Sequence, residues 1–475
     1  MATDDTAKPD VTEKDAAEPG VSDEHPEKHP ATPTGRLDQY FGMTANKTNW
    51  KREILAGTTT FLAMAYILAV NPGILSFGLT AAGVDAPNPG AVFTATALAS
   101  ALGCLVMGLW ARYPIATAPG MGLNAFFAFT VVLTLGIPWQ TALTGTLVSG
   151  VLFFILAVTG AREAIINAIP AQLKLAVGAG IGLFIAFIGL KGGGIVVGSE
   201  ATLVTIGDFT SGTVLLTVFG LVATAVFMVL GWKGGVFYGM LATLVLGVLT
   251  GVIDFELAEG FTPNLDSFGA AFTGFEDAFT VHMIAVILTM LFVDFFDTAG
   301  TLFAVAGQAG LVKDGKLPRA GRALATDSIA TSAGAVLGTS TTTAYIESTA
   351  GVSVGGRTGL TAVTTGFWFL VSLVAFPVFG LVANNPAVTA PALIVVGVLM
   401  AKALGEIEWE KLEYAIPAFL IVVAMPLTYS ISNGIALGLV FFPVMMAAKG
   451  RWREVHPIAW VLMAASIGYF LFLTE

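Results

Sequence analysis

Cysteine, histidine and charged side chains are scarce in this sequence. One cysteine, Cys104, and four histidines occur among 475 residues. An intrachain disulfide is therefore excluded, and no spacing of these residues matches a zinc or iron–sulfur site. Charged residues make up 11% and apolar residues 55%, with a mean hydropathy of +0.82, a composition that no soluble globular domain needs. The sequence predicts a multi-pass membrane protein without a metal or cofactor.

Excess basic charge is also missing, because the formal net charge is −10. Nine Asp and Glu lie in residues 1–35 and six more lie in residues 253–280. This distribution argues against a nucleic-acid partner. Residues 1–45 have almost no large apolar side chain and lack the features of a secretory signal, so we expect a disordered acidic tail.

Long apolar runs dominate the rest of the chain. A spanning helix needs about 20 mostly apolar residues, and this length yields fourteen candidate spans, some of them short. Their expected cores are 53–75, 90–110, 119–135, 139–159, 172–190, 213–231, 235–252, 281–306, 322–338, 345–356, 361–383, 387–404, 413–430 and 433–448. A fifteenth run, 457–473, is expected to cross the membrane or to lie in its interface, and its uniform apolarity favours crossing.

Basic residues indicate the orientation, because Lys and Arg concentrate in cytoplasmic loops. A cytoplasmic N-terminus places nearly all of the loop Lys and Arg on the inner side, and only Lys191 falls clearly outside. The acidic segment 253–280 then becomes an extracellular loop. We therefore expect a protein of the cell membrane with a cytoplasmic N-terminus.

Two of the spans are interrupted at matching positions. Fourteen spans divide into seven and seven, so the second half enters the membrane inverted. The third span, "PIATAPGMGLNAFFAFT", and the tenth, "GTSTTTAYIESTAGVSVGG", combine Gly, Pro or β-branched Thr with a short helix, which predicts extended backbone. Such paired interruptions in the two halves of a transporter point to its binding site. The alternative is a pair of ordinary kinked helices.

Three acidic residues lie inside predicted spans without a basic neighbour. Asp294 and Asp297 in "FVDFFDTAG" share a helix face, and Glu347 lies in the tenth span. An Asp at the centre of a spanning helix costs about 2.5–3.5 kcal/mol, so such acids usually mark a pathway. Because two carboxylates this close disfavour simultaneous ionisation, Asp294, Asp297 and Glu347 are candidates for binding or carrying a proton. The alternative is a helix cap or a distant Arg partner; for Asp327 we expect a solvated or capping role.

A mixture of carboxylates and free helix-start N–H groups suits a neutral heterocycle better than a simple anion. Asn124 offers a donor and an acceptor at the start of the third helix, and Phe126 or Phe127 could stack on a flat ring. Taken alone, such an Asn is more often an N-cap, and such Phe residues usually face lipid or the core.

Four motifs resemble a known family. The segments "NWKREILAGTTTFLAMAYILAVNP", "APGMGLNAFFAF", "FVDFFDTAGTLFAVA" and "GTSTTTAYIESTAGVSVGGRTGLTAV" are similar to the guanine, hypoxanthine and adenine permeases of the AzgA-like branch of the nucleobase transporter superfamily. The resemblance implies the uracil-permease fold, with an inverted seven-helix repeat, a core domain that moves against a gate domain, and an assembly as a homodimer. It covers roughly residues 35–450.

The resemblance also implies which residues contact a purine. They are Asp294, Glu347, Gly122 and Asn124. The run from Tyr345 to Ser348 resembles a Tyr-Gly-Glu-Asn stretch of uracil permeases, with Ile346 in place of Gly, and the resemblance implies further substrate contacts at Tyr345 and Ile346. The proton carrier stays open between Asp294 and Asp297.

These observations predict an all-α polytopic protein that works as a secondary-active purine permease by alternating access, coupled to a proton, with sodium not excluded. It is not expected to be an enzyme. The alternatives are an anion transporter or exchanger of the same fold, or a uracil or xanthine permease. The expected parts are the tail 1–45, a core domain of 46–160 and 281–384, a gate domain of 161–252 and 385–449, the loop 253–280, and a basic loop with an extra apolar segment at 450–475.

Overall fold

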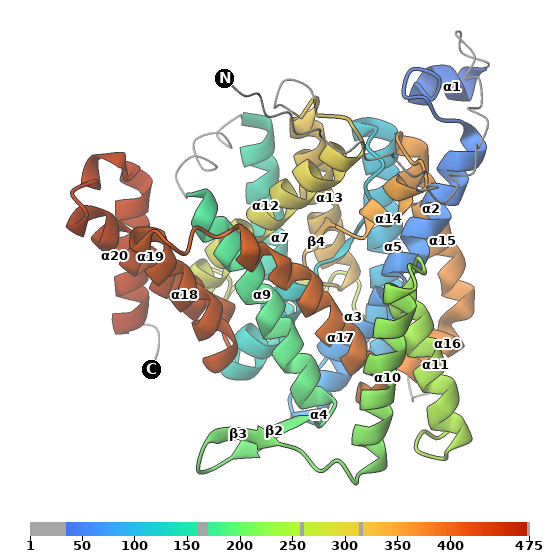
Figure 1. Cartoon of the computed structure of the whole chain (residues 1–475), viewed down its shortest axis with the longest axis horizontal. Coiled ribbons are helices and arrows are strands. Elements are labelled where there is room, and N and C mark those ends of the chain that lie inside the picture. The colour runs from blue at the N-terminus through green and yellow to red at the C-terminus, as the bar shows by residue number, and fades with distance from the viewer. Residues whose placement is uncertain (1–34, 160–169, 257–260, 313–316, 473–475) are drawn as a thin grey trace, which may run out of the picture.

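The computed structural model describes residues 35–159, 170–256, 261–312 and 317–472, which form a bundle of helices (Figure 1). The first part of the predicted tail, residues 1–34, lies outside the described residues. The prediction of disorder up to residue 45 is wrong for its last part, since Arg36–Phe41 forms the helix α1. Asp38 accepts hydrogen bonds from the backbone N–H and the hydroxyl of Thr44 at 2.8 and 2.5 Å. These bonds, together with the burial of Phe41 and Met43, give the short segment its local order.

The elements of the first half follow the predicted order of spans. They are α2 (Trp50–Met64), α3 (Ile67–Pro72), the π-helical η1 (Gly73–Gly78) and α4 (Leu79–Ala81); α5 (Pro89–Val106) and η2 (Met107–Ala111); β1 (Thr117–Pro119), α6 (Met121–Ala125) and η3 (Phe126–Thr134); α7 (Trp139–Thr159); α9 (Ala171–Gly192); α10 (Gly212–Val229); and α11 (Gly235–Leu249).

The second half repeats this pattern of long helices and one strand followed by a helix. Its elements are α12 (Val281–Gln308); α13 (Ala320–Leu337); β4 (Thr342–Ala344) and α14 (Ser348–Ser353); α15 (Gly359–Ser372), η5 (Leu373–Ala375) and α16 (Phe376–Ala383); α17 (Pro386–Ala401) and η6 (Lys402–Glu406); α18 (Leu412–Leu427); and α19 (Ile431–Ala448). Each of the fourteen predicted spans thus corresponds to an element. The fifteenth run forms α20 (Pro457–Phe472), which packs against α19.

The helices pack in two groups. In one, α13 lies against α5 and α7, and α15 lies against α2 and α5; in the other, α9 lies against α17 and α18, and α10 lies against α11 and α17. Close backbone contact holds the first group together. A Cβ at Gly359 would lie only 1.9 Å from the Gly108 carbonyl oxygen, so a side chain there would push α15 away from η2.

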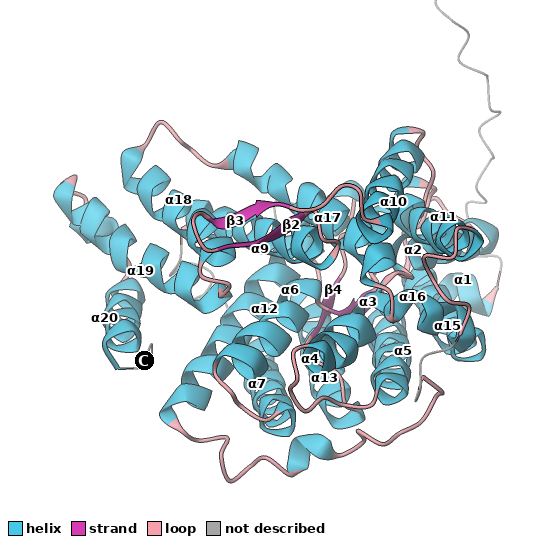
Figure 2. Ribbon diagram, turned by 90° about the horizontal axis from the view of Figure 1, so that it is seen from below, coloured by secondary structure: helices cyan, strands magenta, loops and turns pink. Residues whose placement is uncertain are grey.

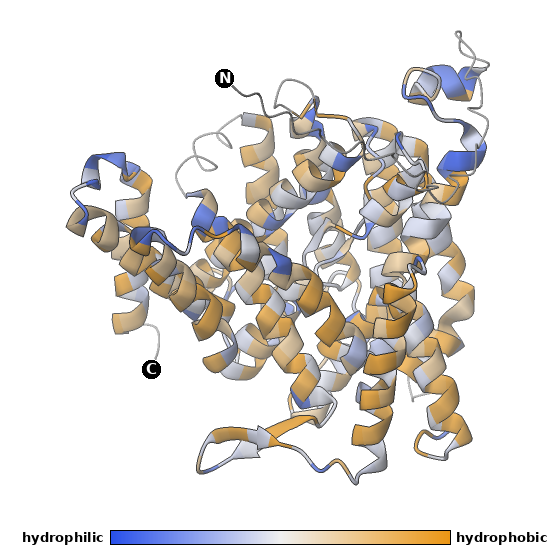
Figure 3. Cartoon of the chain, viewed as in Figure 1, coloured by the Kyte–Doolittle hydropathy of each residue, from blue (hydrophilic) through white to orange (hydrophobic). Residues whose placement is uncertain are grey.

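Apolar side chains cover the outside of the bundle. Hydrophobic residues extend along α10, α11, α15 and α18, whereas polar residues gather near α1 and the start of α2 (Figure 3). Within the described ranges, nine helices are long and apolar enough to cross a membrane, and Val229 and Leu249 are 87% and 78% exposed. Exposed apolar surface of this extent fits a bilayer as the surrounding solvent. The chain is a multi-pass membrane protein.

Two pairs of strands interrupt the helical architecture. The predicted extended pieces β1 and β4 lie inside the bundle, while β2 (Val196–Ser199) and β3 (Leu203–Ile206) form a hairpin at one end of it (Figure 2). The hairpin was not predicted, although Val196, Val197, Val204 and Ile206 favour strands. It connects α9 to α10 on the face opposite α1 (Figure 1). We call this side the hairpin face, and the side that carries α1 the tail face.

Candidate functional site

The centre of the molecule is a crossing of the two interrupted spans. β1 and β4 pair in antiparallel fashion, with Thr117 opposite Ala344 and Pro119 opposite Thr342. Hydrogen bonds extend the pairing at both ends, from Gly120 N to Thr341 O at 2.8 Å and from Tyr345 N to Ala116 O at 2.9 Å. These bonds satisfy backbone groups that a broken helix leaves unpaired, which is the condition for extended chain at membrane depth.

Side chains lock the crossing. The Tyr345 hydroxyl donates to the Pro119 carbonyl at 2.5 Å, and the Ser348 hydroxyl accepts from the Ala116 N–H at 3.0 Å. Both partners of each bond are buried. Tyr345, a predicted substrate contact, therefore uses its hydroxyl to fix β4 against β1.

Asp294 lies behind the crossing and is fully buried. The Thr331 hydroxyl of α13 lies 3.4 Å from its Oδ2 and donates at 2.8 Å to the Thr342 carbonyl. The carboxyl of Asp327 lies beside Asp294, and the Oδ1 atoms of both residues have no partner among the described residues. Asp294 thus belongs to a buried polar cluster between α12 and α13.

The expected solvated role of Asp327 is wrong. Its side chain is fully buried, and its Oδ2 accepts a hydrogen bond from the Thr298 hydroxyl at 2.7 Å. The predicted span begins at residue 322, which puts Asp327 near its end. In the structure α13 begins at Ala320, so Asp327 lies two turns into the helix. Among the described residues, four carboxyl groups therefore lie near the crossing: Asp294, Asp297, Asp327 and Glu347.

Asp297 and Glu347 lie on the open side of the crossing. Asp297 is partly exposed, and the Thr343 hydroxyl lies 3.5 Å from its Oδ2. Glu347, at the junction of β4 and α14, accepts a hydrogen bond from the Tyr66 hydroxyl at 2.5 Å. The two carboxyl groups are near enough for their charges to repel. None of the three predicted acids has an ion-pair partner within the described part of the chain.

A cavity of about 550 Å³ opens beside this pair of acids. That volume lies in the usual range for small-molecule sites. It lies between α9, α12 and η6, and we call it the inner cavity. Asp297 and Ile346 line it together with Ala171, Lys174, Leu175, Val177, Gly178, Ile181, Val293, Phe296, Ala299, Gly300, Thr301, Phe303, Ala304, Ala403 and Glu406. Its wall includes the first turn of α9, so it extends toward the tail face.

The other predicted contacts surround the crossing without lining this cavity. Asn124 is buried, and its Oδ1 accepts a hydrogen bond from the Ser340 hydroxyl, while its Nδ2 has no partner among the described residues. Phe126 is buried in the hydrophobic core. A Cβ at Gly122 would lie 2.4 Å from Ile181 Cγ2 of α9, so Gly122 permits close approach of the two helix groups. Their proposed contacts with a substrate stay predictions.

The site includes four residues that the sequence did not predict as part of it: Tyr66, Asp327, Thr331 and Thr343. Tyr66 lies 281 residues from its partner Glu347, so no local spacing connects the two. For Thr343 the only signal was the β-branched run that predicted β4, and Thr331, which lies in α13, had none. Asp327 is an acid within a predicted span, but the sequence predicted a solvated or capping side chain where the structure has a buried one.

A helical bundle with two extended segments crossing between acidic side chains, next to a cavity, defines a polytopic membrane transporter. The model of the Permease family, Xan_ur_permease, matches residues 51–437. The chain belongs to this family. The resemblance predicted from the four motifs is thereby confirmed.

Curated relatives cover nearly the whole chain. Guanine/hypoxanthine permease PbuG of Bacillus subtilis is 56% identical over 92% of this chain and 100% of its own length. Adenine permease AdeQ of Escherichia coli is 39% identical over 93% and 97% of the two chains. These relatives are permeases and not enzymes, which agrees with the predicted class.

Solved structures share the fold at low sequence identity. The transmembrane domain of the cyanobacterial bicarbonate transporter BicA superposes with a TM-score of 0.58 at 15% identity, covering 82% of this chain and 97% of that domain. The murine anion transporter Slc26a9 in its inward-facing state gives a TM-score of 0.57 at 11% identity, with 90% and 74% coverage. These likenesses concern the fold alone.

Proposed function

We propose that this protein is a secondary-active purine nucleobase permease that takes up hypoxanthine, guanine or adenine. One observation carries the proposal: Asp297 and Ile346, from two different spans, line the same cavity next to the strand crossing and Glu347. The names of the relatives, which specify guanine, hypoxanthine and adenine permeases, support the choice of substrate. A purine ring offers N–H donors to the carboxylates and a flat face to the apolar walls.

The acids also support proton coupling. Asp297 and Glu347 repel one another when both are ionised, so a proton on one of them favours the other's hydrogen bonds to a substrate. Each ligand then stabilises the state that the other prefers, which couples base to proton by linkage. Asp294 stays a second candidate for the carrier, and sodium is the alternative ion.

The two helix groups support the proposal of alternating access. We assign the group of α2, α5, α7, α13 and α15, which pack together, to the core domain, and the group of α9, α10, α11, α17 and α18 to the gate domain. Movement of the core against the gate would carry the crossing from one side to the other. The same proposal includes the inverted repeat, a cytoplasmic tail face in the cell membrane, and the homodimer implied by the resemblance.

An anion transporter is the rival that the fold neighbours suggest, because BicA is a bicarbonate transporter and Slc26a9 is an anion transporter. Four carboxyl groups around the crossing oppose it, since an anion would be repelled there.

Uptake by purified protein in proteoliposomes decides between these functions. Radiolabelled hypoxanthine, guanine, adenine, uracil and sulfate are supplied with a proton gradient, with a sodium gradient, and without either, and empty liposomes give the background. We expect purine accumulation that needs the proton gradient. Uptake of sulfate without any purine would favour the anion transporter, and uptake of uracil alone would favour a pyrimidine permease.

A further inference from the structure

Tyr429 occupies the turn between α18 and α19 in an unusual backbone conformation. Its φ angle is +54°, in the left-handed region that bulky residues seldom adopt. Such a conformation persists only where the surroundings hold it, and it is found preferentially at functional positions. The contacts of the Tyr429 ring show what holds it.

Three phenylalanines and one lysine surround this ring. Phe129 of η3 packs edge-on at 5.5 Å between ring centres, and Phe184 and Phe187 of α9 do so at 5.4 and 6.1 Å. The Lys191 ammonium lies 4.9 Å from the ring centre. Edge-to-face pairs and a cation over a ring are favourable contacts. Tyr429 is thus the shared neighbour of every ring in this group, which we call the aromatic plug.

The plug lies between two hollows along α9. Lys174, Gly178 and Ile181 line the inner cavity, while Ile188 and Gly192 line a second pocket of about 370 Å³ toward the hairpin face. We call this second pocket the outer pocket. Phe184 and Phe187 lie between these sets of residues. Since α9 rises about 1.5 Å per residue, the plug fills roughly one turn of the path from one hollow to the other.

The plug also joins the two helix groups. Phe129 follows α6 and is connected to the strand crossing, whereas Tyr429 connects α18 and α19. Phe129 itself lines the outer pocket. One long hydrogen bond supplements the ring contact, from the Thr130 hydroxyl to the Tyr429 carbonyl at 3.4 Å. A junction made of ring edges and one weak hydrogen bond can separate at modest cost when the core moves against the gate.

We infer that the contact between Tyr429 and Phe129 is the gate that closes the substrate path on the hairpin face. The inference rests on the proposed transport function and adds the residues that must separate before a substrate enters from that side. In the present structure the rings meet, so the inner cavity is closed toward the hairpin face. When Phe129 moves away with the core, the outer pocket and the site become continuous.

Thiol labelling tests the gate without depending on the substrate. Thr301→Cys places a reporter on the wall of the inner cavity, and a membrane-impermeant maleimide is applied from the hairpin face of sealed vesicles. We expect slow labelling with native Tyr429 and labelling about tenfold faster with Tyr429→Ala, because removing the ring shifts the population toward an open path. Tyr429→Phe keeps every ring contact and should label like the parent.

Controls keep the outcomes separable. The chain without the reporter gives the background of the buried Cys104, and a single symmetric peak in size-exclusion chromatography checks that each variant folds. If Tyr429→Ala does not fold, Phe129→Ala breaks the same contact from η3. Unchanged labelling from the hairpin face in folded variants overturns the gate, whatever hypoxanthine uptake shows. Faster labelling in a protein that takes up no purine would leave the gate standing and reject the proposed substrate.

Discussion

The Tyr66 hydroxyl donates a 2.5 Å hydrogen bond to Oε1 of Glu347. Tyr66 lies between α2 and α3, and Glu347 lies between β4 and α14, so the bond joins breaks in the first and tenth spans. Tyr66 is 1% exposed, whereas Glu347 is partly exposed. The buried residue therefore sets the direction in which the carboxylate faces the site.

Tyr66→Phe should weaken purine binding. The variant removes only the hydroxyl, and a hydrogen bond to a charged group contributes about 1.5–3 kcal/mol, so we expect hypoxanthine affinity to fall about tenfold or more. The folded yield should be unchanged, because the ring still fills its site. Tyr40→Phe is the matched control, because it also removes one tyrosine hydroxyl, which donates to the Leu109 carbonyl. Equal affinity in both variants would contradict the role of Tyr66.

Asp297→Asn should abolish accumulation driven by a proton gradient. The amide keeps the size of the side chain but cannot exchange a proton, and Asp297 lines the inner cavity. Uptake of labelled hypoxanthine is measured with and without the gradient. We expect the variant to lose nearly all of the uptake that depends on the gradient. Asp277→Asn, in the exposed loop before α12, controls for the replacement of an acid by its amide. Undiminished accumulation in Asp297→Asn would move the carrier to Asp294 or Glu347.

Glu53→Gln should destabilise the protein without touching the site. Glu53 is fully buried in α2 and caps the start of α15, where it accepts hydrogen bonds from the N–H groups of Arg357, Thr358 and Thr361 and from the Thr361 hydroxyl. Loss of charge at this helix start should cost about 2 kcal/mol. We expect a melting temperature lower by a few degrees and unchanged affinity. Glu276 is exposed in a loop, so Glu276→Gln should have the same melting temperature as the parent.

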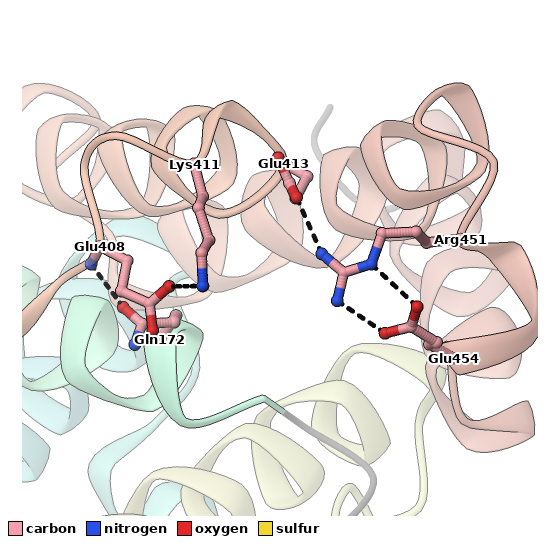
Figure 4. Close-up of polar contacts among 6 residues, drawn as sticks. All are labelled: Gln172, Glu408, Lys411, Glu413, Arg451 and Glu454. Atoms are coloured by element: carbon pink, nitrogen blue, oxygen red, sulfur yellow. Dashed lines mark hydrogen bonds and ion pairs between the residues drawn. The ribbon is translucent and has the colours of Figure 1, made fainter.

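Acidification should weaken the polar cluster that ties the α19–α20 turn to α18. Arg451 bonds Glu454 at 2.9 and 2.6 Å and Glu413 at 2.8 Å, near a second pair of Lys411 with Glu408 (Figure 4). The hydrogen bonds from Arg451 lower the pKa of Glu454. Because the folded pKa is depressed, this stabilisation is present above the ordinary Glu pKa of about 4.3 and is lost as pH falls through the lowered pKa.

Arg451→Gln should therefore reduce the dependence of melting temperature on pH. Melting curves at neutral and strongly acidic pH measure the difference for the parent and the variant. The Arg453 guanidinium lies over the Trp452 ring. The variant Arg453→Gln therefore tests whether the loss of any nearby basic residue has this effect. A variant at Arg451 that loses as much stability on acidification as the parent would contradict the assignment.

Much of the fold follows from local sequence. Apolar runs of sufficient length must cross the bilayer, and this rule located fourteen elements. The Thr run before Tyr345 and the Pro and Gly before Met121 weaken a helix locally, and both positions are strands. By contrast, the order at Arg36–Phe41 goes with the contacts of Asp38 with Thr44 and with the burial of Phe41 and Met43, which a count of apolar residues overlooks.

The sequence alone determined that the chain spans a membrane, where its helices break, and that Asp294, Asp297 and Glu347 lie within it. Only the tertiary structure decided how these residues are used: Asp294 lies behind the crossing beside Asp327, Asp297 lies on the inner cavity, and Glu347 bonds to Tyr66. The reason is that membrane insertion and backbone preference depend on neighbouring residues, whereas these contacts, like that of Tyr429 with Phe129, join segments distant along the chain through packing.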